Sequence, residues 1–200
     1  ICWSLVGSEM CIRDRLKLAA AKHATLATDI LMLYSDKLFW FGQWYRQLWA
    51  ESIGKDGYGA TPVPFLGTVD QHSQLQLYLD GPSDKLFSAI MHGYEDIGIL
   101  VNPSATGDVS LGALEQRTLG DLINASQRGT VDALMAAHRP VRTIATGELN
   151  AAALGALMMH FMLETIITAD LLGVDPFDQP AVEEGKARTK QYLKNFTDKC

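Results

Sequence analysis

The sequence predicts an α/β fold, a three-layer αβα sandwich around a mainly parallel sheet. Short β-rich apolar runs alternate along the chain with longer segments whose apolar residues recur at helical spacing. Isolated strands that alternate with helices imply right-handed crossovers and a parallel sheet. The composition agrees, because 48% hydrophobic and 20% charged residues are typical of an ordinary globular domain.

The pattern places each element in turn. We expect strands over residues 29–35, 62–69, 85–92, 96–101 and 140–145. We expect helices over residues 36–52, from Gln71 onward, over 118–138 and 148–173, and from Pro180 through Tyr192 or beyond. Gly54 and Gly173 suit helix C-termini, Asp70 can cap the helix that follows it, and a Gly/Ser/Asn-rich loop runs to Gly112.

Charge and hydropathy exclude two classes of partner. The net charge of −6 argues against nucleic acid, which requires a basic face. The longest nearly uncharged run, residues 149–163, is shorter than the roughly 20 residues that span a bilayer. We therefore expect a buried core helix there and no membrane partner.

The first 15 residues, ICWSLVGSEMCIRDR, look foreign to the domain. They lack an initiator methionine, and their charges follow the apolar part, the reverse of a secretory signal. The stretch resembles translated sequencing-adapter read-through, so we expect residues 1–15 to be non-native and 16–200 to form one domain. Only Cys200 then remains, which predicts no disulfide framework and no cysteine metal site and fits the cytoplasm.

Three stretches carry the candidate chemistry, and we expect all of them beyond the carboxyl ends of the strands. His72 falls near a helix start, where the dipole favours the neutral imidazole that acid–base work needs. Glu51 falls in a last helical turn, where the dipole makes a carboxylate a stronger base. Lys186, behind Gln179 and Glu183, could hold a sugar oxygen or a phosphate.

Each candidate also has a structural interpretation. His72 is a capping or packing residue on that interpretation, Glu51 an exposed side chain near a helix end, and Lys186 one half of a solvated i,i+3 ion pair. Structural roles are expected for the remaining histidines, His23, His92, His138 and His160. The sequence offers no Gly-rich phosphate loop and no Ser-His-Asp order.

Three motifs together resemble glucose-6-phosphate isomerase. The stretch FDQPAVEEGK, residues 177–186, resembles the C-terminal signature of that family, except that Ala181 replaces the usual glycine. QLWAESIGK resembles the segment with the catalytic glutamate, and GTVDQHSQLQL the segment with its histidine. The resemblance runs from about Leu16 to the end of the chain and implies the sugar isomerase (SIS) type of sandwich.

The resemblance implies a role for each matching residue. Glu51 would move a proton between C2 and C1 of the open-chain sugar through a cis-enediol. His72, reaching the site from the other subunit of a homodimer, would open the sugar ring with the help of Lys186. Gln47 and Gln179 would line the phosphate side. The implied reaction, part of glycolysis and gluconeogenesis, needs no cofactor and no metal.

The resemblance also implies a missing part. The family's phosphate-gripping Ser/Thr loop and its active-site arginine belong to sequence before residue 16, and Arg117, Arg128 and Arg142 do not match that arginine. We therefore expect this chain to be the C-terminal portion, inactive alone, with apolar surface exposed where the first domain packs.

Two alternatives stay open. A different sugar-phosphate isomerase or an aminotransferase with the same domain type would lack the joint occurrence of the three motifs. A non-catalytic sugar-phosphate sensor would have lost Glu51 or Lys186, and both are present.

Overall fold

The computed structural model of the protein describes residues 26–103 and 109–197. Four parallel strands form one sheet in the order β2-β1-β3-β4, where the strands are β1 (Thr28–Leu33), β2 (Thr61–Leu66), β3 (Lys85–His92) and β4 (Val141–Gly147). The helices are α2 (Phe39–Ile53, after the 3-10 turn Asp36–Leu38), α3 (Gly67–Asp80), α4 (Leu119–Ala136), α5 (Ala151–Leu172) and α6 (Val182–Thr197). The predicted three-layer α/β class is confirmed, and the predictions on residues 1–15 and on Cys200 lie outside the described residues.

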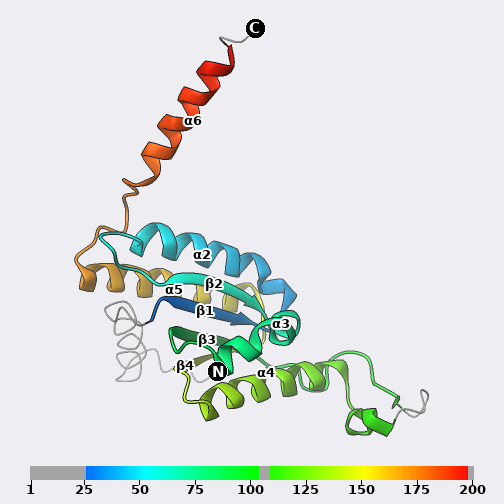
Figure 1. Ribbon diagram of the computed structural model, residues 1–200. Coiled ribbons are helices and arrows are strands. Elements are labelled where there is room, and N and C mark those ends of the chain that lie inside the picture. Colours follow the sequence, from blue (N-terminus) through cyan, green and yellow to red (C-terminus); the bar gives the residue numbers. More distant parts are fainter. Residues whose placement is uncertain (1–25, 104–108, 198–200) are drawn as a thin grey trace.

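The helices cover the two faces of the sheet in pairs (Figure 1). Alternate β1 side chains point to opposite faces, as the twofold period of a strand requires. Leu31 and Leu33 join α2 and α5 in one apolar cluster, whereas Ile30 and Met32 join α3 and α4 in the other. The sheet is therefore buried on both faces, which explains why its strands are nearly continuous apolar runs in the sequence.

The crossovers fix which end of each helix meets which edge of the sheet. A helix between two parallel strands runs back antiparallel to them, so it starts at the carboxyl ends of the strands, here called the carboxyl edge. It finishes where the strands begin, here called the amino edge. The Trp49 indole Nε1 near the end of α2 accordingly donates to the Ala60 carbonyl, just before β2, at 3.1 Å. Figure 1 shows α3 starting at the carboxyl edge and α6 leaving from the amino edge.

A buried polar network crosses the layer between the sheet and the α2–α5 pair. Arg142 of β4 makes a bidentate ion pair with Glu164 of α5, with N–O distances of 2.6 and 3.1 Å, and its Nε donates to the Ser88 hydroxyl at 2.8 Å. Asp29 of β1 accepts hydrogen bonds from Ser88 at 3.4 Å and from Tyr45 of α2 at 2.5 Å. All five side chains are buried. One network thus joins three strands and two helices.

The pKa shifts in this network favour the protonation states in which Tyr45 and Arg142 donate hydrogen bonds. Burial raises the pKa of Tyr45 well above its ordinary value, and Asp29 raises it further, so the phenol stays a proton donor. Burial by itself would lower the pKa of Arg142, but the charge and hydrogen bond of Glu164, together with the charges of Asp29 and Tyr45, outweigh burial, so the pKa is raised. Glu164, a charged residue on a largely apolar helix, thus has a defined partner.

Helix α5 is less buried than its sequence suggested. Its inner side contributes Leu157, Phe161 and Glu164 to the core. Its outer side exposes an apolar stripe of Met159, Leu163, Ile166, Ile167 and Leu171, between 40 and 53% exposed. The predicted buried core helix is only half right, because apolar residues occur around the whole circumference of this 22-residue helix and only one side can face the sheet.

The same helix is long and apolar enough to cross a membrane by length and composition alone. Its packing argues for a core helix, since the buried Glu164 on its inner side is paired with Arg142 of the sheet. The outer stripe is also apolar surface of the kind expected from the resemblance.

One predicted helix start is wrong, whereas the predicted helix ends at Gly54 and Gly173 are confirmed. Helix α3 begins at Gly67 rather than Gln71. Gly67 packs so closely on the Tyr34 ring that a Cβ would clash with it, so this helix start requires glycine. Asp70 therefore lies inside the helix and accepts a hydrogen bond from the Leu66 amide at 2.6 Å. Gly54 is the C-cap of α2 but has a negative φ of −70°, whereas Gly173 ends α5 in the left-handed region with a φ of 74°.

The predicted strand over 96–101 is also wrong. That segment forms one isolated antiparallel bridge, between Leu100 and Thr118. Asp96 and Gly98 have positive φ angles of 60° and 96°, which interrupt an extended conformation. Helix α6 starts at Val182, two residues after Pro180.

We expect Asp121→Asn to destabilise the domain in a pH-dependent way. Asp121 completes a capping box at the start of α4, where its carboxylate accepts from the Thr118 amide at 2.8 Å and from the Asp96 amide at 3.1 Å. These hydrogen bonds lower its pKa below the ordinary 3.8. A lowered folded-state pKa stabilises the fold above the unfolded-state pKa, and this stabilisation is lost as the pH falls through the folded-state pKa.

Urea unfolding between pH 7 and pH 3 tests this. The substituted protein should be less stable at pH 7 and should approach the parent at the acidic end. Asp132→Asn, on the exposed side of the same helix, is the matched control and should change little. A deficit for Asp121→Asn that stays constant with pH would contradict the prediction.

We expect removal of one partner of the buried ion pair to destabilise the fold more than removal of both. Glu164→Gln should lower the free energy of unfolding by about 3–5 kcal/mol, because it leaves the buried Arg142 charge without its counterion. The double substitution Arg142→Met and Glu164→Leu should recover part of the loss, since it removes both charges of the pair and fills the space, while Asp29 keeps its hydrogen bond from Tyr45. Urea unfolding measures both, and a double variant as unstable as Glu164→Gln would contradict this account.

Candidate functional site

Glu51, on the last turns of α2, is held by two amides. Gln47, one turn earlier, donates its side-chain amide to Oε1 at 3.0 Å, and Gln179 donates to Oε2 at 2.9 Å. Gln179 lies 128 residues further along the chain, in the loop between α5 and α6. Glu51 itself is half-buried. Three of the five predicted site residues therefore lie together, with both oxygens of the carboxylate oriented.

The amides leave the carboxylate usable as a base. Each oxygen of an ionised carboxylate accepts more than one hydrogen bond, so one amide on each still leaves a lone pair for an incoming proton. An amide also fixes the carboxylate without adding a charge that would weaken it as a base. The arrangement can therefore accept and return a proton at a fixed position, which is the requirement for general base catalysis.

The loop that carries Gln179 is attached to α2 by a second contact. Lys55, just beyond the C-cap Gly54, forms an ion pair with Asp178 at 2.9 Å and also donates to the Asp175 carbonyl. The Lys55 side chain is only 11% exposed. Lys55 was not among the predicted site residues, although it lies inside the motif QLWAESIGK. A lysine directly after a helix C-cap was the available signal.

His72 lies at the other edge of the sheet. It is in the second turn of α3, because the helix starts earlier than predicted, and its side chain is exposed. The preceding Gln71 points inward and accepts hydrogen bonds from Tyr34 at 3.1 Å and Thr130 at 3.3 Å. This anchors α3 with His72 facing outward at the carboxyl edge, whereas Glu51 lies at the amino edge. The prediction that all candidates share the carboxyl edge is wrong.

Lys186 is also apart from Glu51. It lies on α6, which leaves the body of the domain (Figure 1). The side chains of α6 are exposed from Val182 through Asn195. The Lys186 amine pairs with Glu183 at 2.7 Å, the i,i+3 contact of the structural interpretation. Within this chain, Lys186 and His72 are thus not brought to the Glu51 cluster.

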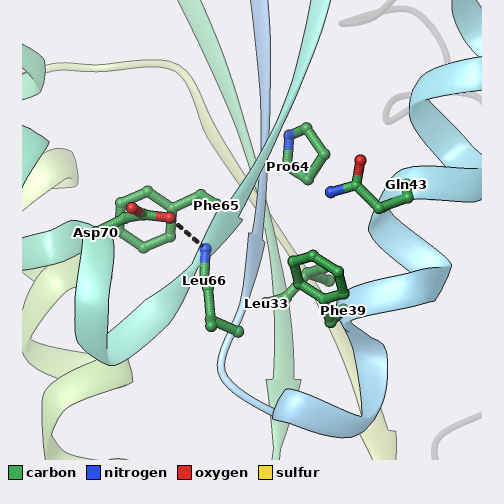
Figure 2. Close-up of a pocket in the computed structure, with 7 residues that line it drawn as sticks. All are labelled: Leu33, Phe39, Gln43, Pro64, Phe65, Leu66 and Asp70. Atoms are coloured by element: carbon green, nitrogen blue, oxygen red, sulfur yellow. Dashed lines mark hydrogen bonds between the residues drawn. The ribbon is translucent and has the colours of Figure 1, made fainter.

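A small hollow opens at the carboxyl edge between β1, β2 and α2 (Figure 2). It encloses about 290 Å³, including space open to solvent, and is lined by Leu33, Phe39, Gln43, Pro64, Phe65, Leu66 and Asp70. The described lining includes no cation, and the Asp70 carboxylate already accepts the Leu66 amide, as the dashed line in Figure 2 marks. This hollow is therefore unsuited to an anionic ligand, and none of the predicted site residues lines it.

Two of the other histidines have partners within the fold, and His23 lies outside the described residues. The His92 Nδ1 lies 2.6 Å from the Gly147 carbonyl, and the His160 Nε2 lies 3.8 Å from Glu164. No group of three or more His, Cys, Asp or Glu side chains within residues 26–103 and 109–197 could hold a metal ion.

The fold and the cluster define a three-layer α/β domain with an oriented carboxylate at the amino edge of a parallel sheet. Comparison with known proteins shows which enzymes this domain is similar to. The chain is 45% identical over 163 residues to the glucose-6-phosphate isomerase of Rubrobacter xylanophilus, which covers 80% of this chain and 37% of that protein. It is 36% identical over 204 residues to the enzyme of the same name from Carboxydothermus hydrogenoformans, covering 93% and 44%. No protein-family model matches the chain.

Solved structures agree on the fold. A hypothetical protein from Thermus thermophilus superposes with a TM-score of 0.82 at 33% identity, covering 92% of this chain and 45% of that one. A glucose-6-phosphate isomerase from Chlamydia trachomatis superposes with a TM-score of 0.75 at 15% identity, covering 94% and 38%, and shows the fold alone. The predicted resemblance to glucose-6-phosphate isomerase is confirmed, and the chain spans less than half the length of these relatives.

Proposed function

We propose that the full-length protein containing this chain interconverts glucose 6-phosphate and fructose 6-phosphate. The Glu51 cluster is the observation that carries this proposal. It joins two of the three motifs that resemble the isomerases, since Gln47 and Glu51 come from one and Gln179 from another. Two relatives that match most of this chain, at 45% and 36% identity, are named for this activity.

Glu51 is the proposed base. It removes the proton from C2 of the open-chain aldose and returns it to C1 of the resulting cis-enediol, so one carboxylate serves both half-reactions without a redox cofactor. Its fixed orientation suits this role, because a proton must leave one carbon and arrive on its neighbour while the base moves little. In the domain as described, Gln47 and Gln179 supply that orientation, and we propose that they also face the phosphate side of the bound sugar.

His72 and Lys186 are the proposed ring-opening residues. Since His72 and Glu51 lie at opposite edges of one sheet, a site that uses both residues needs His72 from another copy of the chain. This geometry supports a homodimer with shared sites. Lys186 would come from α6, whose exposed side chains leave it available to a site outside its own domain body. A cytoplasmic location without a membrane or nucleic-acid partner remains part of the proposal.

Label exchange tests the role of Glu51. We expect the full-length protein, incubated with fructose 6-phosphate in D₂O, to place deuterium at C2 of the glucose 6-phosphate formed. Glu51→Gln should lower this rate by roughly 10²- to 10⁴-fold, the usual contribution of a general base. Glu184→Gln, an exposed acid on α6 paired with Arg188, is the control and should retain the parent rate. NMR of the product gives the label position.

The same experiment separates the alternatives. Sugar-phosphate binding without deuterium exchange in the parent would contradict an isomerase and indicate a sensor. Exchange that survives Glu51→Gln would place the base on another residue.

Mixing two inactive variants tests the shared site. We expect Glu51→Gln and His72→Ala to be inactive separately, and a refolded equimolar mixture to regain about a quarter of the parent activity, because random pairing gives half heterodimers with one intact site each. A mixture as inactive as its components would contradict contribution of His72 from a second chain. Mixing either variant with itself is the control.

A further inference from the structure

We infer that Lys55 is a positioning residue, which docks the loop between α5 and α6 onto the end of α2 and so keeps Gln179 on the Glu51 carboxylate. The inference rests on the proposed function for its catalytic consequence. The docking itself rests only on contacts within the chain.

Lys55 is well placed to act as an anchor. Its backbone is fixed on both sides, because its amide donates to the Ile53 carbonyl at 2.7 Å and its carbonyl accepts from the Tyr58 amide at 2.8 Å. It follows Glu51 by four residues, with the helix end between them. The two side chains thus share one rigid support, and any group held by Lys55 is held at a defined place relative to the carboxylate.

The loop receives two adjacent contacts from that support. Asp178 pairs with Lys55 at 2.9 Å, and the next residue, Gln179, donates to Glu51 at 2.9 Å. The second Lys55 contact, with the Asp175 carbonyl, anchors the start of a turn in which the Asp175 side chain accepts from the Phe177 amide at 2.8 Å. The loop thus meets the helix end at both sides of this turn.

The buried Lys55 ammonium holds the loop through two contacts at once. The Lys55 side chain is 11% exposed, whereas that of Asp178 is 55% exposed, so the cation is largely buried while its partner remains near solvent. Removal of the cation takes away the carbonyl contact and the ion pair together. Gln179 then keeps only its own hydrogen bond to Glu51, five residues beyond Val174, where the start of the loop is buried in the core.

The catalytic consequence is a loss of alignment. A carboxylate held by one amide instead of two samples more rotamers, and small misalignments of a base reduce the rate of proton transfer. We expect Lys55→Met in the full-length protein to lower kcat about tenfold while KM changes less than twofold. Lys55→Arg should restore most of kcat, because a guanidinium still pairs with Asp178.

A double-substitution cycle shows whether Lys55 acts through Gln179. If it does, Gln179→Ala should lower kcat about as much as Lys55→Met, and the double variant should be no slower than the slower single one. Lys85→Met is the matched control. The Lys85 side chain is equally covered, at 10% exposed, but its contacts are with Asp84 and the Pro82 carbonyl.

Hydrogen exchange tests the docking independently of activity. Backbone amides of residues 174–179 should exchange faster in Lys55→Met and in Asp178→Asn than in the parent or in Lys85→Met. Unchanged exchange in both substituted proteins would overturn the inference, as would multiplicative rate losses in the double variant. If the parent shows no isomerase activity, the proposed function fails, and the exchange measurement still decides whether Lys55 docks the loop.

Discussion

The ion pair between Arg142 and Glu164 is the constraint on which the arrangement of this domain depends. A charge buried in the core needs a partner in a fixed position, and here the partner is on a different element. Through Ser88 and Asp29 the same network reaches Tyr45 on α2. The two helices on this face of the sheet are therefore set relative to each other by directional hydrogen bonds as well as by apolar packing. Because the network fixes α5 relative to α2, the loop that follows α5 lies against the end of α2, where the Glu51 cluster forms.

The direction of each crossover determines which site residues one copy of the domain can bring together. Parallel strands with helical returns send α2 and α5 to finish at one edge and α3 to begin at the other. Glu51 and His72 are only 21 residues apart in sequence. In space, the full length of the strands separates them. The Glu51 cluster needs only one chain, whereas a site that includes His72 needs two. This division follows from topology and does not depend on the details of any side chain.

Much of the fold could be predicted from the sequence, because strands buried on both faces are short apolar runs and the helices between them have a clear period. The segment 96–101 was misassigned since apolar composition alone cannot show the positive φ angles of Asp96 and Gly98. For the candidate site, the sequence proposed residues but not their arrangement. Glu51 and Gln179 were identified from motifs, yet their direct contact spans 128 residues, and the docking by Lys55 depends on a loop conformation that no local pattern encodes.

Helix α6 behaves differently from the rest of the chain in thermodynamic terms. Isolated helices of 16 residues are marginal in water, and the two intrahelical ion pairs from Glu183 and Glu184 add only about 0.2–0.5 kcal/mol each. With its side chains exposed through Asn195, α6 takes part in a helix–coil equilibrium of its own and adds little to the cooperativity of unfolding. A surface that binds α6 therefore also stabilises it as a helix. The conformational entropy lost on ordering α6 then lowers the affinity of that association.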